Sequence, residues 1–326
     1  MSDNVSPDYS SRFYLNLCDD FTRRDQTLNL ISQLNQLIKG VQKHRGITMA
    51  VLGGSGGFRT EFQQLQHQVD RRVATLQAFI AHSGNLISPR EEEALQMDWQ
   101  TIRQDWQDDK LSDNFELHSH FIEQLRNIVF RLARELGRPL AGTLPAEQEH
   151  QPSLDDPLAA YPQLFKQIEL LNFAAKEVPE MIEYLAKVRG LSTFIAASGN
   201  VDYHNDRKLR FVLQCVKQQH EKLRHQAERL QDILGGSIVS LPDIKTAELK
   251  LIYLLEVVEK DVLGGGTIKT NSHQLFKIAT TLIDVYWAVT NEGLSLLRQW
   301  HQDMLEDWLK EGGVEQNSAN SLQSQA

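Results

Sequence analysis

The feature that most restricts the fold is a set of apolar rows with helical spacing that include an arginine. Residues seven apart lie on one side of a helix, and rows of them form a seam that packs against other helices. Two such rows run side by side in the first third of the chain: Ile31, Ile38, Arg45 and Leu52, and Leu34, Val41 and Thr48. Alternating β-branched runs are missing from the sequence, so we expect an all-α fold.

Turn residues divide the chain into two sets of four helices. The first set is expected at about residues 13–52, 59–83, 89–109 and 115–137, and the second at about 158–198, 203–234, 243–262 and 271–311. Glycine-rich turns and Ser88-Pro89 supply helix ends, and four prolines lie between the sets. We therefore predict a first bundle at 13–138, a connector at 139–157, a second bundle at 158–311 and a disordered polar tail at 312–326.

The two sets resemble each other in sequence. The segment "KHRGITMAVLGGSG" from Lys43 corresponds to "KVRGLSTFIAASGN" from Lys187, 144 residues later. Ser119-His120 corresponds to Ser272-His273, 153 residues later, near the start of the last helix in each set. Short connections favour antiparallel neighbours. We therefore expect two four-helix bundles related by an internal repeat.

The second set also has an arginine on an apolar row. That row is Ile168, Ala175, Ile182, Arg189 and Ala196. Pro179 falls within it, where it kinks the helix or starts a new one. A buried guanidinium needs an anionic partner. Each arginine therefore pairs with a carboxylate on a neighbouring helix, extends its charged end to the surface of the bundle, or binds an oxyanion, whose planar shape suits paired hydrogen bonds from arginine.

The order of these motifs resembles the NIT domain, a nitrate- and nitrite-sensing family. The family's first repeat is typified by "ERGLSALYLASGG", and this chain has "HRGITMAVLGGSGG" at that place. "VRGLSTFIAAS" takes the place of the second repeat, and "FKIATTLIDVYWAVTNEGLSLL" is similar to the closing helix. The resemblance extends over about residues 28–310. It implies two four-helix bundles with nitrate or nitrite bound between helices by arginines.

Transferred by position, the resemblance makes Arg45 and Arg189 the main candidate ligands. Neighbouring candidates are glycines that permit close approach and hydroxyls that donate hydrogen bonds: Gly46, Thr48, Gly190 and Ser192. The chain departs from the family by having His44 and Val188 where glutamates precede the arginines. It also lacks the family's arginine on the second helix. Arg210 lies at the repeat equivalent of Gln66 and is a candidate replacement for it.

Composition argues against several other classes of protein. The formal net charge is −9 and no basic run is present, which disfavours direct nucleic-acid binding. No apolar stretch is long enough to span a membrane, no secretory signal is evident, and two cysteines fit a reducing cytoplasm. No metal site, cofactor or catalytic arrangement is indicated. His118 and His120 diverge on a helix, so a cap or surface position is expected for both.

These observations predict a non-enzymatic, cytoplasmic, stand-alone sensor of nitrate or nitrite. Its signal is expected to leave through an output protein or a second copy of the chain in a homodimer. A candidate exposed patch for this purpose lies near the end of the last helix: Leu297, Trp300, Met304, Leu305 and Trp308. The alternatives are a helical interaction scaffold without a ligand, and a helical enzyme or metalloprotein.

Overall fold

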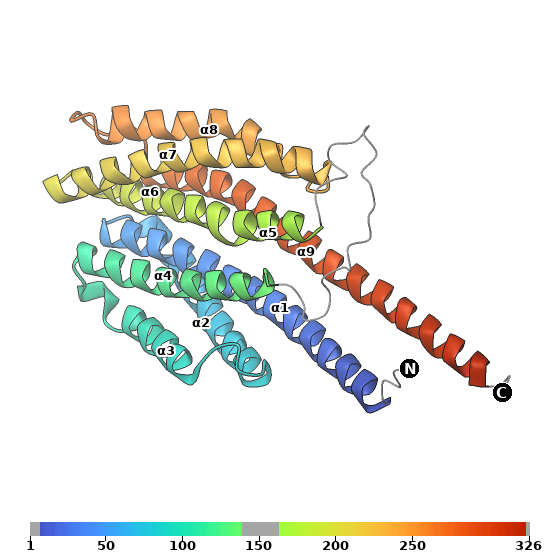
Figure 1. The fold of residues 1–326 in the computed structure, drawn as a ribbon. Coiled ribbons are helices and arrows are strands. Elements are labelled where there is room, and N and C mark those ends of the chain that lie inside the picture. Colours follow the sequence, from blue (N-terminus) through green and yellow to red (C-terminus); the bar gives the residue numbers. More distant parts are fainter. Residues whose placement is uncertain (1–6, 139–162, 324–326) are drawn as a thin grey trace.

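The computed structural model describes residues 7–138 and 163–323, and all regular structure in these ranges is helical (Figure 1). The first set of helices consists of α1 (Pro7–Leu52), α2 (Arg59–His82), α3 (Pro89–Arg103) and α4 (Leu111–Leu136). The second set consists of α5 (Gln163–Asn172), α6 (Val178–Ser198), α7 (Tyr203–Leu234), α8 (Asp243–Val257) and α9 (Ser272–Gln323). The all-α prediction is confirmed for these ranges. The expected connector at 139–157 lies outside them.

Local sequence accounts for the positions of several helix ends. The Ser88 hydroxyl accepts a hydrogen bond from the Glu91 N–H, and the Glu91 carboxylate accepts one from the Ser88 N–H. Pro89 follows at the first helical position of α3. Gly199 and Gly235 end α6 and α7 with φ angles of 66° and 56°. Glycine adopts this left-handed conformation at the least cost, so these positions stop the helices cleanly.

The long helix of the second set contains a π-helical turn. Residues Phe173–Glu177 form this turn and join α5 to α6 in one continuous helical rod, with Pro179 just after it. A π turn holds more residues than an α turn, so it rotates the preceding side chains relative to those that follow. Ile168 is accordingly 41% exposed, whereas Ala175 and Ile182 are buried. The predicted apolar row therefore holds from Ala175 onward and fails at Ile168.

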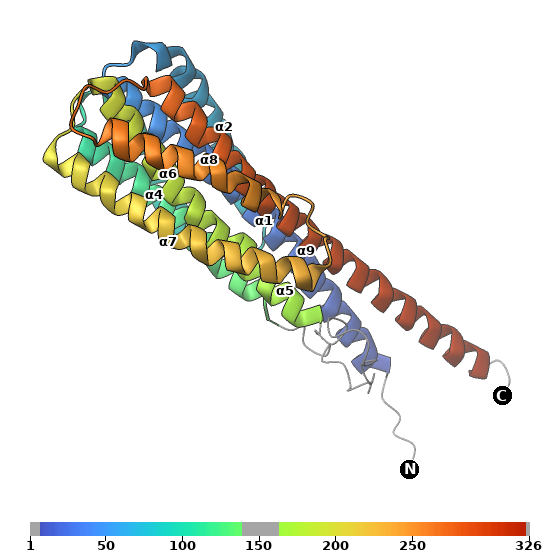
Figure 2. The ribbon, with the colours of Figure 1, turned by 90° about the horizontal axis from the view of Figure 1, so that it is seen from above.

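Helix α1 lies at the centre of the fold. It packs against α2 and α4 of its own set and against α6 and α9 of the other (Figure 2). Between residues 27 and 50 most of its side chains are buried, as expected for a helix with neighbours on several sides. One continuous cluster of buried apolar side chains includes residues from both sets. The boundary between the sets is therefore part of the hydrophobic core.

Helices α1 and α6 approach each other at two glycines. A Cβ atom at Gly190 would lie 2.8 Å from Sδ of Met49 and 3.8 Å from Cα of Gly46. A Cβ atom at Gly46 would lie 3.0 Å from Cε2 of Phe276 and 3.4 Å from Nε of Arg189. The absence of side chains at these positions permits the close packing. The arginine that precedes each glycine is thereby placed in the interior, where the two sets meet.

The two terminal helices extend beyond the rest of the fold. The first turns of α1 and the last turns of α9 project from the same end of the molecule (Figure 1). Phe21 packs there against Met304 and Leu305, and Arg298 donates to Asn29 at 2.7 Å. Leu297 is buried and Trp300 packs against the main core. The expected exposed patch is therefore largely covered at these positions, because α1 lies against this part of α9. The side chain of Trp308 is outside the described part.

Helix α9 is longer than predicted. It continues to Gln323, so residues 312–323 are helical and not disordered as expected. Extending an existing helix adds one hydrogen bond per residue without a new nucleation step, so a polar sequence can continue a helix that has already formed. None of the described helices combines the length and apolarity needed to cross a bilayer.

Candidate anion-binding site

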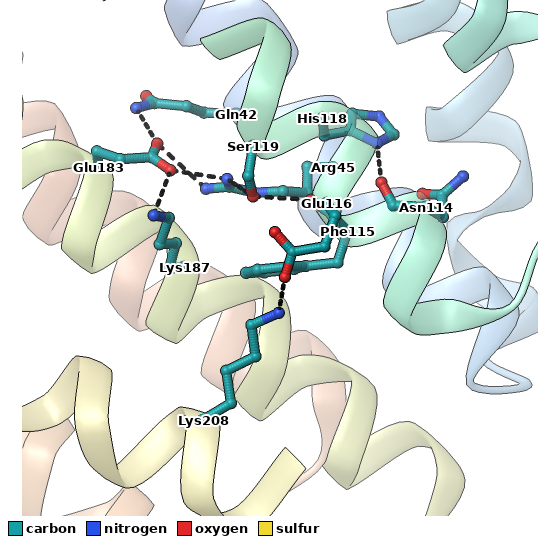
Figure 3. A network of polar contacts seen from close by, with 10 residues as sticks. All are labelled: Gln42, Arg45, Asn114, Phe115, Glu116, His118, Ser119, Glu183, Lys187 and Lys208. Carbon is teal, nitrogen blue, oxygen red and sulfur yellow. Dashed lines mark hydrogen bonds and ion pairs between the residues drawn. The ribbon is translucent and has the colours of Figure 1, made fainter. Parts of the chain in front are cut away.

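Arg45 is completely buried and forms a salt bridge between the two sets of helices. Its Nη1 donates to Oε1 of Glu183 at 2.7 Å, and its Nη2 donates to Oε2 at 3.2 Å (Figure 3). Nη1 also donates to Oγ of Ser119 at 3.0 Å. Paired donation of this kind is the strongest way for a guanidinium to bind a carboxylate. Arg45 therefore has the structural salt bridge that was one of its expected roles.

Both carboxylate oxygens of Glu183 are occupied by donors. Nε2 of Gln42 donates to Oε2 at 2.9 Å, and Nζ of Lys187 lies 3.6 Å from Oε1. Burial alone would raise the pKa of Glu183. The positive charges of Arg45 and Lys187 and the hydrogen bonds from Arg45 outweigh burial, so the pKa is lowered. Glu183 is consequently an anion at neutral pH and neutralises Arg45.

An aromatic ring separates Arg45 from a second cation. The guanidinium carbon lies 5.1 Å from the centroid of the Phe115 ring, and Nζ of Lys208 lies 4.1 Å from it. Lys208 also pairs with Glu116 of α4 (Figure 3). Cations are attracted to the negative face of an aromatic ring. Phe115 thus stabilises both positive charges and connects α7 to the site.

Arg189 is buried without a carboxylate partner. It is 2% exposed, and no ion pair joins it to an acidic residue of the described part of the chain. Its Nη1 donates to Oγ1 of Thr280 at 3.1 Å, and its guanidinium carbon lies 4.9 Å from the centroid of the Phe276 ring. Its Nε is buried and makes no hydrogen bond within residues 7–138 and 163–323. Of the two buried arginines, Arg189 is therefore the one without a paired carboxylate in the described part of the chain.

Three carboxylates act electrostatically on Arg189, and each of them is already paired with another cation. These pairs are Asp284 with Lys39, Glu61 with Lys43, and Glu183 with Arg45. Burial, followed by the charge of Arg45, lowers the pKa of Arg189 from 12.5 to about 9, against the opposing effect of the three carboxylates. The guanidinium still keeps its charge at neutral pH. A positive charge is thus held in the core with incomplete neutralisation.

The two arginines have matching surroundings. Each lies over a phenylalanine and donates to a hydroxyl four residues further along the same helix: Phe115 and Ser119 for Arg45, and Phe276 and Thr280 for Arg189. The offset between these contact residues is 161 (276 − 115, and 280 − 119), not the 153 proposed from Ser119-His120 and Ser272-His273. Ser119 lies well inside α4, whereas Ser272 begins α9, so the earlier correspondence is wrong.

The predicted hydroxyl donors are mostly engaged within their own helices. Oγ1 of Thr48 donates to the carbonyl of His44 at 2.9 Å, and Oγ of Ser192 donates to the carbonyl of Arg189 at 3.4 Å. Oγ1 of Thr193 is buried and has no partner in the described chain. The hydroxyl that contacts Arg189 is that of Thr280, which the sequence did not single out.

Arg210 does not join the buried arginines. It lies on the exposed face of α7 and pairs with Asp206 at 2.9 Å on the same helix, and it also donates to the carbonyl of Leu263. Arg210 was suggested as a ligand because it is the repeat equivalent of Gln66, but its position in the fold is on the surface. Arg210 instead ties α7 to the turn that follows α8.

The sequence did not predict a buried histidine pair beside Arg45. Nδ1 of His44 lies 2.8 Å from Nε2 of His118, and Nδ1 of His118 lies 2.8 Å from the Asn114 carbonyl. His118 is fully buried, so the expected cap or surface position is wrong for it. Burial, and for His44 the neighbouring His118, lowers the pKa of both, that of His118 to about 3. Both imidazoles are neutral in the folded protein and add no positive charge to the site.

The described chain offers few other features near this site. An open pocket of about 840 Å³ is lined by residues at the far ends of α1, α2 and α3, including Arg59, Arg103 and Trp106, and neither Arg45 nor Arg189 borders it. Within the described ranges, no three His, Cys, Asp or Glu residues gather as they would around a metal ion. Arg45 is already neutralised by Glu183, whereas the charge of Arg189 has no paired carboxylate in the described chain.

Comparisons of the chain with protein-family models, with curated proteins and with solved structures found no match. The arrangement of Arg45, Arg189 and their neighbours is therefore the basis for assigning a function.

Proposed function

We propose that this protein is a non-enzymatic sensor that binds a small planar oxyanion, nitrate or nitrite, at Arg189. The observation that supports the proposal best is the burial of the Arg189 guanidinium without a carboxylate partner in the described chain. An unpaired charge in a protein interior is costly, and an anion at Arg189 would relieve that cost. Nitrate and nitrite present two oxygens in one plane, which matches the fork of donors on arginine.

The neighbours of Arg189 favour a small ligand. The Phe276 ring covers one face of the guanidinium, Thr280 occupies one donor, and Gly46 lies against Nε. The site is closed to solvent, so an anion enters only with a shift of the surrounding side chains or helices. Such a coupling between binding and packing is what a sensor requires.

The proposal includes the two-bundle architecture and its origin by duplication. The support is a correspondence of contacts: α1 packs against α2 and α4 as α6 packs against α7 and α9, and α3 packs against α4 as α8 packs against α9. The arginines share an offset of 144, and their phenylalanine and hydroxyl contacts share an offset of 161. In this arrangement each arginine serves one half of a two-fold site.

The signal is proposed to pass to another protein or to a second copy of the chain. Titration calorimetry with nitrate, nitrite and chloride tests the binding step. The wild type should bind nitrate or nitrite in preference to chloride, Arg189→Lys should bind about ten- to a hundredfold more weakly, and Arg189→Met should not bind. Equal affinity of folded wild-type and Arg189→Met protein for nitrate would rule out this site.

The second candidate function is an interaction scaffold without a ligand. The salt bridge between Arg45 and Glu183 favours it, because one of the two arginines has a purely structural partner. Calorimetry separates the two functions, since a scaffold would give no heat of binding with any small oxyanion.

A further inference from the structure

The surroundings of the two arginines differ at one position. Glu183 of α6 pairs with Arg45 of α1. With the offset of 144 between the arginines, the position on α1 that corresponds to Glu183 is residue 39 (183 − 144), which is Lys39. Lys39 pairs with Asp284 at 2.8 Å and supplies no negative charge to Arg189. One arginine thus has an internal anion at the place where the other has a lysine.

The carboxylate of Glu183 is held as a bound oxyanion would be. Its two oxygens receive four contacts from three side chains: Arg45 at 2.7 and 3.2 Å, Gln42 at 2.9 Å and Lys187 at 3.6 Å. The group is planar, carries one negative charge and has only 3% of its side chain exposed. Formate has the same planar CO₂⁻ group, and nitrate is a planar anion of similar size. While Glu183 stays in place, no anion from solution can reach the same donors.

We infer that Glu183 is a resident oxyanion that fills the half-site around Arg45, so that the chain takes one small planar oxyanion from solution and not two. The number of one bound anion per chain rests on the proposed function, because that anion is proposed to bind at Arg189. The role of Glu183 does not depend on the proposed function. Removing its carboxylate should open a latent site for formate or nitrate, built from Arg45, Gln42 and Lys187.

The test is chemical rescue in an Arg189→Met background, which removes any binding at Arg189. Thermal unfolding of R189M and R189M/E183A is measured in formate, nitrate and chloride at equal ionic strength. Formate or nitrate at about a hundred times its dissociation constant should raise the Tm of R189M/E183A by about 4 °C relative to chloride. R189M alone should show no such difference.

Glu177 provides the matched control. It is a buried carboxylate just before α6, and it pairs with Lys222 at 2.5 Å and Lys176 at 3.5 Å. Those lysines are 49% and 44% exposed, so both return to solvent when the carboxylate is removed. R189M/E177A should therefore show no rescue by formate. Adding Arg45→Met to R189M/E183A should abolish the rescue, because the guanidinium that receives the anion is gone.

Each outcome decides the inference. If R189M/E183A is unfolded in chloride, formate must restore its helical circular dichroism, and a chain that stays unfolded in both salts counts against the latent site. Rescue equal to that of R189M/E177A also overturns it. Calorimetry on E183A with Arg189 intact should give two nitrate ions per chain where the wild type gives one. A wild type that binds none, with rescue present, would refute the proposed function and leave the role of Glu183 standing.

Discussion

Arg45 of α1 and Glu183 of α6 are 138 residues apart in the chain and share two hydrogen bonds in its interior. Because each helix belongs to a different set, this pair fixes how the sets pack on each other. A buried pair contributes little net stability when complete, but its disruption strands one charge in a medium of low polarity. Arg189 is already in that unpaired state in the described chain. The same substitution at the two arginines should therefore have different effects on the free energy of unfolding.

Neutralising each arginine in turn tests this difference. Arg45→Met should lower the free energy of unfolding by about 3–5 kcal/mol, because Glu183 loses its partner. Arg189→Met should leave it unchanged or raise it by about 1–3 kcal/mol, because a buried unpaired charge is removed. Urea unfolding in buffer free of oxyanions measures both. A loss in Arg189→Met as large as that in Arg45→Met would show that Arg189 has an internal partner after all.

The His44–His118 pair predicts loss of stability in mild acid. Both histidines have a pKa in the folded protein below the usual 6.5, that of His118 being about 3. At a pH between its folded and its unfolded pKa, each histidine is protonated in the unfolded chain and not in the folded one. Stability therefore falls as the pH drops below about 6.5. His118 should cost about 1.4 kcal/mol per pH unit there, or about 2 kcal/mol between pH 6.5 and 5, and His44 adds to the loss in the same direction.

Urea unfolding at pH 7, 6 and 5 measures the slope. His118→Leu should make the slope shallower by the share of one histidine, because His301 and His220 also have a lowered pKa and still contribute to it. His225→Leu is the control, since that side chain is 69% exposed. Identical slopes in the wild type and in His118→Leu would contradict a neutral buried pair.

The contact between Gly190 and Met49 predicts that even a methyl group is too large at the crossing of α1 and α6. Gly190→Ala would bring Cβ to 2.8 Å from Sδ of Met49, so the helices or Met49 must shift. The expected net loss is about 1–2 kcal/mol, because overpacking costs more than the gain in helix propensity. Gly56→Ala is the control, as a Cβ there meets nothing within 4 Å. Thermal unfolding of both variants is the measurement, and a Gly190→Ala variant as stable as the wild type would show that Met49 moves aside freely.

Much of the helical framework could be predicted from the sequence, and the reasons are local. The expected helix at 203–234 coincides with α7, because Asp202 caps its start and Gly235 ends it. The row that includes Arg45 is buried as expected down to Ile31. The error at Ile168 has a local cause too, but a π turn has no simple sequence signal.

The partners within the site could not be predicted, because they depend on how the two sets meet. Periodicity showed that Arg45 and Arg189 lie on apolar rows, yet it gave no means of finding Glu183 on the facing helix. His118 was expected at the surface from its spacing to His120, although its place on the inner face of α4 makes it part of the core. The offset of 161 was also hidden, since it appears only when the phenylalanine and hydroxyl contacts of both arginines are seen together.

Direct nucleic-acid binding is predicted to be absent. The net charge of −9 opposes association with phosphate backbones, since few counterions would be released. Gel-shift titration with random RNA and DNA at moderate salt should show no complex below about 1 μM protein. Sub-micromolar binding that weakens steeply with added salt would contradict this.

The contact between Arg189 and Thr280 suggests how an anion at the site would be sensed. Thr280 and Phe276 are near the start of α9, which then runs unbroken to Gln323. An anion that competes for Nη1 of Arg189 would displace the Thr280 hydroxyl and shift this helix against α6. A ligand shifts an equilibrium only by its difference in affinity between two packings, and a tenfold difference amounts to about 1.4 kcal/mol. A free energy of this size shifts the equilibrium between the two packings if their populations are nearly equal without the anion.

Hydrogen exchange with and without saturating nitrate tests this transmission. Protection should change around Arg189, around Thr280, and at residues 295–310, where α9 lies against Phe21 of α1 in a small cluster outside the main core. That cluster contains few apolar contacts, so it should open with less free energy than the core and respond most to a shift of α9. Arg189→Met with nitrate serves as the control and should show no change. If nitrate binds but protection changes only within one turn of Arg189, the shift does not travel along α9, and the protein binds the anion without passing on a signal by this helix.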